Sequence, residues 1–190
     1  GIERKPAQYQ MPEQQYFECR TLNSAIETIT AEITASTNKI YAQKKQKTDT
    51  SAVLRSYNQI VKTLKEQLKK LKEELQNKLL LWQPGLVKQV RSVKGIGSRA
   101  TATLIVATQG FKNTHSYQQL ISYAGLSPKL YTSGKSIRGK VRISKKGGKQ
   151  LRHILYMCAL NAKTTNPACK ALFDRLVAKR KKKKLAIIAV

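Results

Sequence analysis

Apolar residues recur at helical spacing over the first 84 residues of the chain. Between residues 21 and 43 they predict one amphipathic helix, although the threonines there weaken it because β-branched side chains lose rotamer freedom. A clearer stripe runs through residues 52–82, where the spacing alternates between three and four. Pro84 and Gly85 predict its end. The first seam is Leu22, Ile26, Ile29, Ile33 and Ile40, and the second is Leu54, Tyr57, Val61, Leu64, Leu68, Leu71 and Leu75.

The two stripes allow more than one arrangement. They could pair with each other as an antiparallel hairpin, or the heptad stripe could form a coiled coil with another chain and make a homo-oligomer. A helix that simply faces a core is a further alternative. The register of the heptads does not decide between them, so residues 21–84 are predicted as a helical or coiled-coil arm.

Residues 85–190 carry shorter patterns. Residues 126–149 are rich in Gly, Ser and Lys, and they predict a turn or a small β-hairpin around 126–145. The predicted fold class is therefore mainly α, with the arm followed by a compact basic helical domain. Helices are predicted at residues 86–93, 100–107, 117–123, 149–162 and 167–178.

Positive charge dominates the composition. The chain has 37 Lys and Arg against 10 Asp and Glu, a formal net charge of +27. Residues 85–190 hold 23 of the basic residues and a single acid, Asp174, a net charge of +22. A folded segment of that charge is expected to bind a polyanion, since neutralising phosphates releases counterions. A charged face that serves only solubility is the weaker alternative.

The cysteines, the histidines and the lengths of the apolar runs bear on metal binding, on the cellular compartment and on membrane insertion. Its three cysteines form no CxxC pair and its two histidines lie far apart, so no zinc site is predicted. An odd number of cysteines in a Lys-rich chain is typical of the reducing cytoplasm. No apolar run approaches the roughly 20 residues that span a membrane. We therefore expect a cytoplasmic protein with no membrane partner.

The segment VKGIGSRATATLI predicts two helices joined by a tight turn, as in a helix-hairpin-helix. Gly95 and Gly97 lack a Cβ, which lets a phosphate approach the backbone around Ile96. The N–H groups that open the next helix then face an anion, and Lys94 and Arg99 add charge. Such contacts do not read DNA sequence. An ordinary helix–helix turn is the alternative.

Residues 125–153 form a second candidate site, with many basic residues, four serines and no acid. Ser133 precedes Gly134 in a turn, where its hydroxyl could attack a phosphodiester and form a covalent phosphoserine–DNA link. A serine in a Lys-rich loop is more often a phosphate ligand or simply solvated. The basic side chains predicted to hold phosphates or stabilise the developing charge are Lys135, Arg138, Lys140, Arg142, Lys145 and Lys146.

Carboxylates for a catalytic metal site are scarce. Metal-dependent phosphoryl transfer needs several carboxylates around two Mg²⁺ ions. Residues 85–190 offer only Asp174, and most acids of residues 1–84 lie on predicted helix surfaces. We expect no metal site in this chain.

Four motifs in residues 86–190 occur in an order that resembles one family. They are VKGIGSRATATLI, YQQLISYAGLSP, SGKSIRGKVRISKKGGKQLRHILYMCAL and NPACKALFDRL. Together they resemble the C-terminal domain of the DEDD-type insertion-sequence transposases, which include the Piv-type DNA invertases and the bridge-RNA-guided recombinases. The heptad helix also resembles the coiled coil that precedes this domain.

The resemblance implies that two domains supply different parts of the catalytic site. In the family, an N-terminal RuvC-like domain binds Mg²⁺ through four carboxylates, and the C-terminal domain supplies a serine that becomes joined to DNA. The serine of the SG motif corresponds to Ser133. The resemblance further implies a structured guide RNA, an oligomer and Mg²⁺ in the full-length enzyme, which would carry out transposition or DNA recombination.

The sequence also departs from the family, because no carboxylate domain is present. Residues 1–20 resemble the linker that follows such a domain, and residues 85–190 correspond to the DNA-binding, serine-bearing domain. We therefore expect part of an enzyme, whose activity alone is in doubt. Two alternatives stay open: a non-catalytic basic nucleic-acid-binding module with a coiled-coil dimerisation arm, and a fragment whose purpose is dimerisation.

Overall fold

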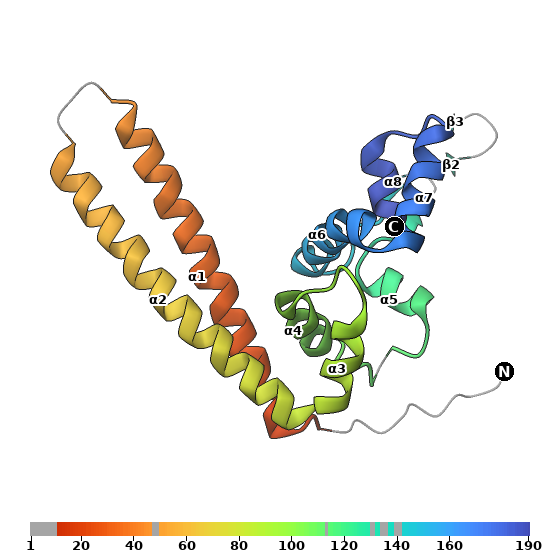
Figure 1. Ribbon diagram of the computed structural model, residues 1–190, viewed down its shortest axis with the longest axis horizontal. Helices are drawn as coiled ribbons and strands as arrows, with labels where there is room; N and C mark the ends of the chain where they lie inside the picture. The colour runs from red at the N-terminus through yellow and green to blue at the C-terminus, as the bar shows by residue number, and fades with distance from the viewer. Residues whose placement is uncertain (1–10, 47–49, 113, 130–131, 134–136, 139–141) are drawn as a thin grey trace. The chain divides into compact units, whose positions relative to one another are not determined.

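The computed structural model describes residues 11–46, 50–112, 114–129, 132–133, 137–138 and 142–190. Over these residues the chain is mainly α-helical, as predicted (Figure 1). The chain divides into two compact units, Gly1–Lys78 and Leu79–Val190. The helices are α1 (Gln14–Lys44), α2 (Ser51–Trp82), α3 (Pro84–Ser92), α4 (Ser98–Ala107), α5 (Tyr117–Tyr123), α6 (Lys149–Thr165), α7 (Pro167–Ala178) and α8 (Lys183–Ala189). The strands are β1 (Pro128–Lys129), β2 (Thr132–Ser133), β3 (Ile137–Arg138) and β4 (Arg142–Ile143).

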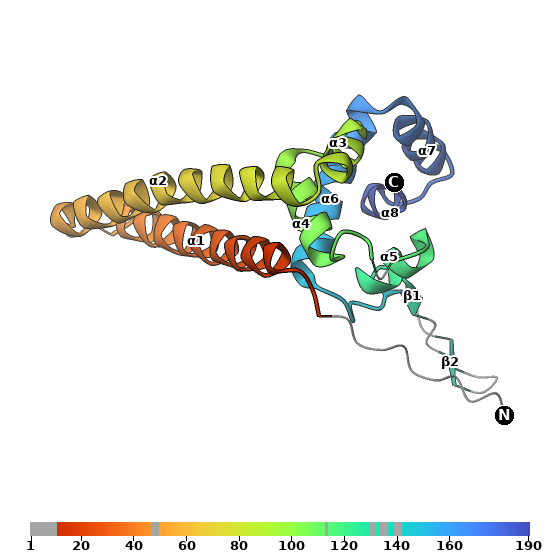
Figure 2. The same cartoon turned by 90° about the horizontal axis from the view of Figure 1, so that it is seen from below.

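In the first unit, α1 and α2 form an antiparallel hairpin whose helices lie side by side in both views (Figures 1 and 2). Lys78 Nζ lies 2.6 Å from Glu18 Oε2, and farther along the hairpin Lys39 Nζ lies 5.6 Å from the centre of the Tyr57 ring. The Lys78–Glu18 pair is more than a third exposed, so it contributes little stability and mainly marks the pairing of the helices.

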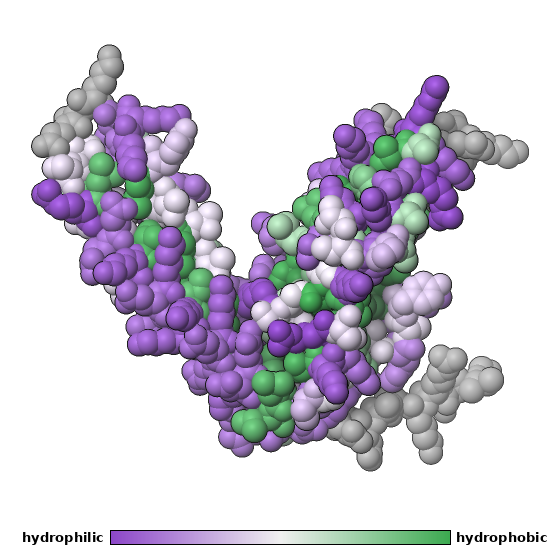
Figure 3. All heavy atoms as spheres, viewed as in Figure 1, coloured by the Kyte–Doolittle hydropathy of each residue, from purple (hydrophilic) through white to green (hydrophobic). Residues whose placement is uncertain are grey.

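Apolar burial along the seam holds the hairpin together. Every predicted seam position is buried or half-buried, and Ile26, Val61 and Leu75 are among the most buried. In Figure 3 the hydrophobic atoms of the hairpin appear as a line of green patches between hydrophilic surfaces. The chain thus contains the hairpin arrangement, one of the two pairings that the stripes allow. Pairing with another chain stays a prediction.

The first helix is longer than the apolar spacing predicted, since α1 begins at Gln14 instead of residue 21. Its threonines do not interrupt it, and several of their hydroxyls donate to carbonyl oxygens four residues earlier. Thr30 Oγ1 donates to the Ile26 carbonyl at 2.6 Å, and Thr37 Oγ1 donates to the Ile33 carbonyl at 2.7 Å. At the start of α1, Tyr16 and Cys19 are buried. This burial extends the helix beyond the predicted stripe.

The second unit is built around α4 and α6. Residues 100–106 of α4 are all buried, and α6 packs against α4, α7 and α8. Leu104, Ala124 and Leu151 form a buried cluster that joins α4, the end of α5 and α6. Val90, Ile96, Ala107, Phe111, Leu126 and Leu155 pack around this cluster. The core therefore connects both segments that carry the predicted site residues.

The strands form the small β structure that the sequence allowed around residues 126–145. β1 pairs antiparallel with β4, and β2 pairs antiparallel with β3. The pairing continues toward α6 as Ser144 N donates to the Ser127 carbonyl at 2.8 Å and Lys145 N donates to the Gly125 carbonyl at 2.9 Å. We call residues 126–145 the ribbon.

One helix was not predicted. α8 begins within the basic run at residues 179–184, and the apolar stretch that follows the run was not assigned to an element by the sequence. The helix is only seven residues long, so its periodicity is weak. Ala186 and Ile187 are buried, which anchors it in the second unit.

Candidate nucleic-acid interface

The turn between α3 and α4 is compact and hydrogen-bonded. Ile96 N donates to the Val93 carbonyl at 3.1 Å, which closes the turn. Gly97 has extended backbone angles and is the N-cap of α4, and its carbonyl accepts the hydrogen bond from Thr101 N at 2.9 Å. The first N–H groups of a helix have no acceptor within the helix, and such groups at the start of α4 are of the kind that an anion can bind.

Gly95 is required by packing as well as by its backbone angle. Its φ is +108°, a conformation that residues with a Cβ rarely adopt. A Cβ at this position would also lie 2.7 Å from the Ala162 Cβ and 2.9 Å from the Ala162 Cα on α6. The turn is therefore pressed directly against α6. The predicted contact of Gly95 with DNA stays a prediction.

Cys158 of α6 forms a second link to the turn. Burial raises the pKa of the Cys158 thiol, and a hydrogen bond from the Gly97 backbone partly offsets this effect. The thiol therefore stays protonated and unreactive at neutral pH, as expected for a structural cysteine. Because α6 contacts the turn at both glycines, it determines where the N-terminus of α4 points.

Alanine substitutions at the two glycines should have very different effects. Gly95→Ala is expected to lower the free energy of unfolding by about 2–3 kcal/mol, since the new methyl group meets the α6 backbone. Gly97→Ala places its Cβ in open space and is expected to cost about 1 kcal/mol or less, the loss of a glycine N-cap. Urea unfolding of both variants measures the difference. Equal stability would contradict the packing of the turn on α6.

The ribbon carries Ser133, the predicted nucleophile. Its backbone belongs to β2 and pairs with Ile137, while Thr132 pairs with Arg138 on β3. Ser133 and Ile137 are thus the described pair that flanks residues 134–136, which lie outside the described part of the structure. The side chains of Ser133 and Arg138 lie outside the described part of the structure, as do Lys135 and Lys140 entirely.

At its base, the ribbon is attached to α6 by a clamp of Gly125, Gly147 and Arg152. The Arg152 guanidinium donates to the Gly147 carbonyl at 2.6 Å and to the Ala124 carbonyl at 3.1 Å. A Cβ on Gly125 would lie 2.5 Å from Gly147 N, so the two backbones touch where no side chain fits. This clamp fixes the direction in which the ribbon leaves the domain.

The described cations of the two candidate segments face solvent with two exceptions. Lys94, Arg142, Lys145 and Lys146 are exposed, whereas Arg99 and the clamp residue Arg152 are half-buried. Lys145 adopts a left-handed φ of +57°. Exposed cations without neighbouring acids give a surface that attracts phosphates.

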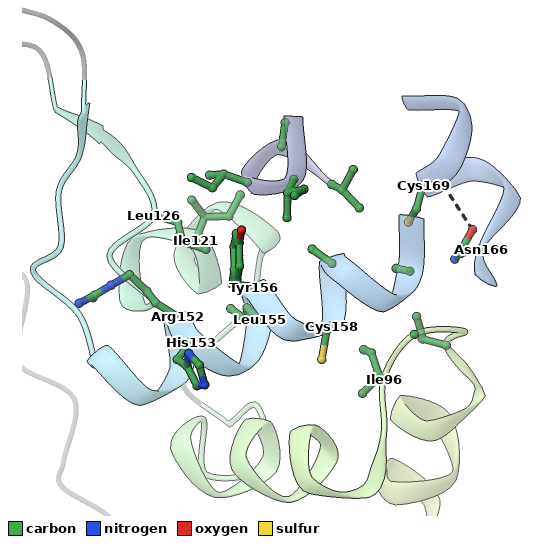
Figure 4. A pocket seen from close by; sticks show the side chains of 18 of the residues that line it. Ile96, Ile121, Leu126, Arg152, His153, Leu155, Tyr156, Cys158, Asn166 and Cys169 are labelled. Atoms are coloured by element: carbon green, nitrogen blue, oxygen red, sulfur yellow. Dashed lines mark hydrogen bonds between the residues drawn. The ribbon is translucent and has the colours of Figure 1, made fainter. Parts of the chain in front are cut away.

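The structure brings the turn and the base of the ribbon to one cavity of about 640 Å³ in the second unit. Lys94, Gly95 and Ile96 line it from the turn, and Leu126 and Ile143 line it from the ribbon. Figure 4 shows α6 along the cavity, with Cys158 and Arg152 on the same helix. The two segments that the sequence singled out are therefore neighbours, although about 30 residues separate them along the chain.

The described residues contain no cluster of potential metal ligands and no membrane-spanning helix. No three His, Cys, Asp or Glu side chains come close enough to hold a metal ion there. None of the described helices is both long and apolar enough to cross a bilayer.

Comparison with known proteins then identifies this part of the chain. Residues 87–174 match the family described as "Transposase IS116/IS110/IS902 family". The second unit is an IS110-type transposase domain. The match includes both the turn and the ribbon, so the two candidate segments belong to one domain of this family.

Curated relatives agree with this assignment. The chain is similar to the pilin gene-inverting protein of Moraxella bovis, at 36% identity over 100 residues, and to that of Moraxella lacunata, at 35% over 100 residues. It is also 32% identical over 90 residues to the uncharacterised 43.6 kDa protein of insertion element IS110 in Streptomyces coelicolor. The matches cover 52%, 52% and 47% of this chain, and 31%, 31% and 22% of the respective relatives. The chain thus spans less than a third of these relatives.

Sequence reasoning missed the clamp of the transposase domain. Arg152 stands within an apolar helical stretch, LRHILYMCAL, where a cation on a buried face would have been the only signal. Gly125 and Gly147 lie 22 positions apart, and nothing local indicates that they touch. Their role depends on how the ribbon folds back to α6.

Proposed function

We propose that this chain is the DNA-binding and serine-bearing portion of a transposase or recombinase. The family match over residues 87–174 carries the proposal, because it places the turn and Ser133 within one transposase domain. The clamped ribbon supports it further, since a nucleophile needs a backbone whose direction is fixed.

In the proposed reaction, the Ser133 hydroxyl attacks a DNA phosphodiester. A bond forms between the serine oxygen and phosphorus, and the bond from phosphorus to one deoxyribose oxygen breaks. The serine gives up its proton, and the leaving oxygen takes one up. Attack on the phosphoserine by another DNA hydroxyl restores the serine and completes strand exchange. Lys135, Arg138 and Arg142 stabilise the negative charge that develops at phosphorus.

The turn is proposed to hold the DNA backbone, as a helix-hairpin-helix does. Lys94 is exposed beside it and attracts the phosphate, while the N-terminus of α4 receives it. Lys140, Lys145 and Lys146 would hold further phosphates of DNA or of a guide RNA, and Arg99 would add charge at the start of α4. Contacts of this kind position the nucleic acid without reading its sequence.

The described residues offer no set of ligands that fits Mg²⁺. Asp174 is the only acid in residues 85–190, and the described residues bring no three potential ligands together. A carboxylate domain elsewhere in an intact enzyme would have to hold the ion. On the basis of the family resemblance, we also propose that the intact protein uses a guide RNA and forms an oligomer through the α2 heptads.

A non-catalytic nucleic-acid-binding module is the second candidate. The net charge of +22 on residues 85–190 favours it, since this charge accounts for polyanion binding without any chemistry at Ser133. The two candidates differ in whether a covalent intermediate forms.

Covalent trapping separates these candidates. The intact protein containing this chain is incubated with its DNA, denatured and digested with nuclease, and the nucleotide-bearing residue is identified by fragmentation mass spectrometry. We expect a nucleotide on Ser133. A nucleotide on another residue, or no adduct in a preparation that exchanges strands, would contradict the serine assignment.

A further inference from the structure

A run of six consecutive cations extends from the end of α7 into the first two residues of α8, and all six are exposed. We call residues 179–184 the cationic turn; they are Lys179, Arg180, Lys181, Lys182, Lys183 and Lys184. The one acid of residues 85–190, Asp174, lies more than one helical turn earlier, on α7. No part of the proposed reaction uses these residues.

The backbone of the cationic turn has a defined structure. Arg180 N donates to the Val177 carbonyl at 2.9 Å, and Lys181 N donates to the Leu176 carbonyl at 3.1 Å. This pair of hydrogen bonds, with Arg180 at a φ of +56°, is the Schellman motif that ends many helices. Glycine is the usual residue at the left-handed position of that motif, because a Cβ there is unfavourable. Here an arginine occupies it.

The chain after the turn is anchored. Leu185 N and Ala186 N both donate to the Lys182 carbonyl, at 2.8 and 3.1 Å, and begin α8. Ala186 is 0% exposed and Ile187 is 7% exposed, and α8 packs against α6 and α7. The backbone that carries the cations is therefore held at both ends, unlike the backbone of a flexible basic tail.

The cationic turn places like charges close together, and a bound polyanion would relieve their repulsion. Six adjacent cations repel one another, and bound phosphates replace this repulsion with attraction. Because the backbone is already ordered, binding loses less conformational entropy than it would for a flexible tail. An arginine where glycine is the usual residue is a local outlier that calls for a functional explanation.

We propose that the cationic turn is a nucleic-acid-binding surface that contacts the phosphodiester backbone, in addition to the α3–α4 turn and the ribbon. It does not depend on the chemistry at Ser133. The chemistry recognised is the phosphate backbone, which duplex DNA and duplex RNA both supply.

Charge removal tests this surface. The variant Lys181→Gln/Lys182→Gln/Lys183→Gln/Lys184→Gln is compared with Lys62→Gln/Lys65→Gln/Lys69→Gln/Lys70→Gln, which removes the same charge from exposed positions on α2. Affinity for a duplex DNA and a duplex RNA is measured against salt. The first variant should lose about tenfold or more in affinity, and its salt slope should fall by about 0.9 per lost phosphate contact.

The control is expected to change affinity by less than about threefold, because its lysines lie outside the proposed contact with phosphates. A general effect of net charge would weaken both variants equally. If only one duplex shows the loss, that duplex is the ligand of the cationic turn; a loss with either duplex supports the proposal. Equal losses in the two variants would show a net-charge effect and overturn it, and so would an unchanged affinity for both duplexes.

Arg180→Gly provides an independent test, because folding and binding should move in different directions. Glycine suits the left-handed backbone at this position, so the melting temperature should stay the same or rise. The affinity for the duplex that binds should fall about two- to fivefold through loss of one cation. If Arg180→Gly binds as tightly as the unmodified chain, Arg180 does not contribute to binding, whatever the melting temperature of the variant. That result would contradict its proposed role.

Discussion

Gly147→Ala is expected to disrupt the base of the ribbon and to lower the free energy of unfolding by about 4 kcal/mol or more. A Cβ at Gly147 would overlap the Tyr123 carbonyl oxygen and lie 2.6 Å from the Ala124 carbonyl carbon. These are backbone atoms, so no side-chain rotation can make room. The ribbon would have to separate from the end of α5, which would also break the Arg152 hydrogen bond to the Gly147 carbonyl.

The neighbouring residue supplies the matched control for this substitution. Gly148→Ala adds the same methyl group one position later, where the nearest atom is the Leu151 Cβ at 3.9 Å. It is expected to change the free energy of unfolding by about 1 kcal/mol or less. Chemical denaturation of both variants, followed by circular dichroism, measures the difference. Similar stabilities would show that the close approach of Gly125 and Gly147 does not hold the ribbon.

Ser133→Ala, placed in the intact enzyme, is expected to reduce strand exchange at least about a thousandfold, as loss of a nucleophile does in other enzymes. DNA affinity should change by less than about threefold, because one hydroxyl contributes little beside so many cations. Strand exchange on a defined DNA substrate and a binding titration measure the two effects separately.

Ser144→Ala is the control for that experiment. Ser144 lies on the same ribbon, close to its base, and its hydrogen bond to the Ser127 carbonyl is made by the backbone N–H, which alanine keeps. This variant should exchange strands at close to the unmodified rate. Normal exchange by Ser133→Ala would remove Ser133 from the reaction, whatever the family resemblance implies.

The arm was predictable because its signal is local and repeated. The seam from Leu54 to Leu75 follows one helical face, and burial along that face is what the structure shows. The helices at residues 117–123 and 167–178 were also predicted at their observed limits. Ser116 and Asn166 cap them through side chains that accept backbone N–H groups, and such residues mark helix starts in the sequence.

Long-range contacts were not predictable in the same way. The GIG pattern indicated a turn, but its packing against Ala162 depends on a helix more than sixty residues later. The clamp at Arg152 likewise joins residues whose proximity exists only in the folded chain. The apolar stretch of α8 was too short for periodicity to distinguish a helix, so neither this helix nor the anchored cationic turn was predicted.

The central claim is that the folded, cationic second unit binds the sugar-phosphate backbone of a nucleic acid. The most direct measurement is a titration of the purified 190-residue chain with duplex DNA and duplex RNA from about 50 to 200 mM salt. The account predicts tight binding at low salt and a log–log salt slope of about −4 or steeper, which corresponds to several neutralised phosphates. An absence of binding to either duplex at the lowest salt, or an affinity independent of salt, would contradict it.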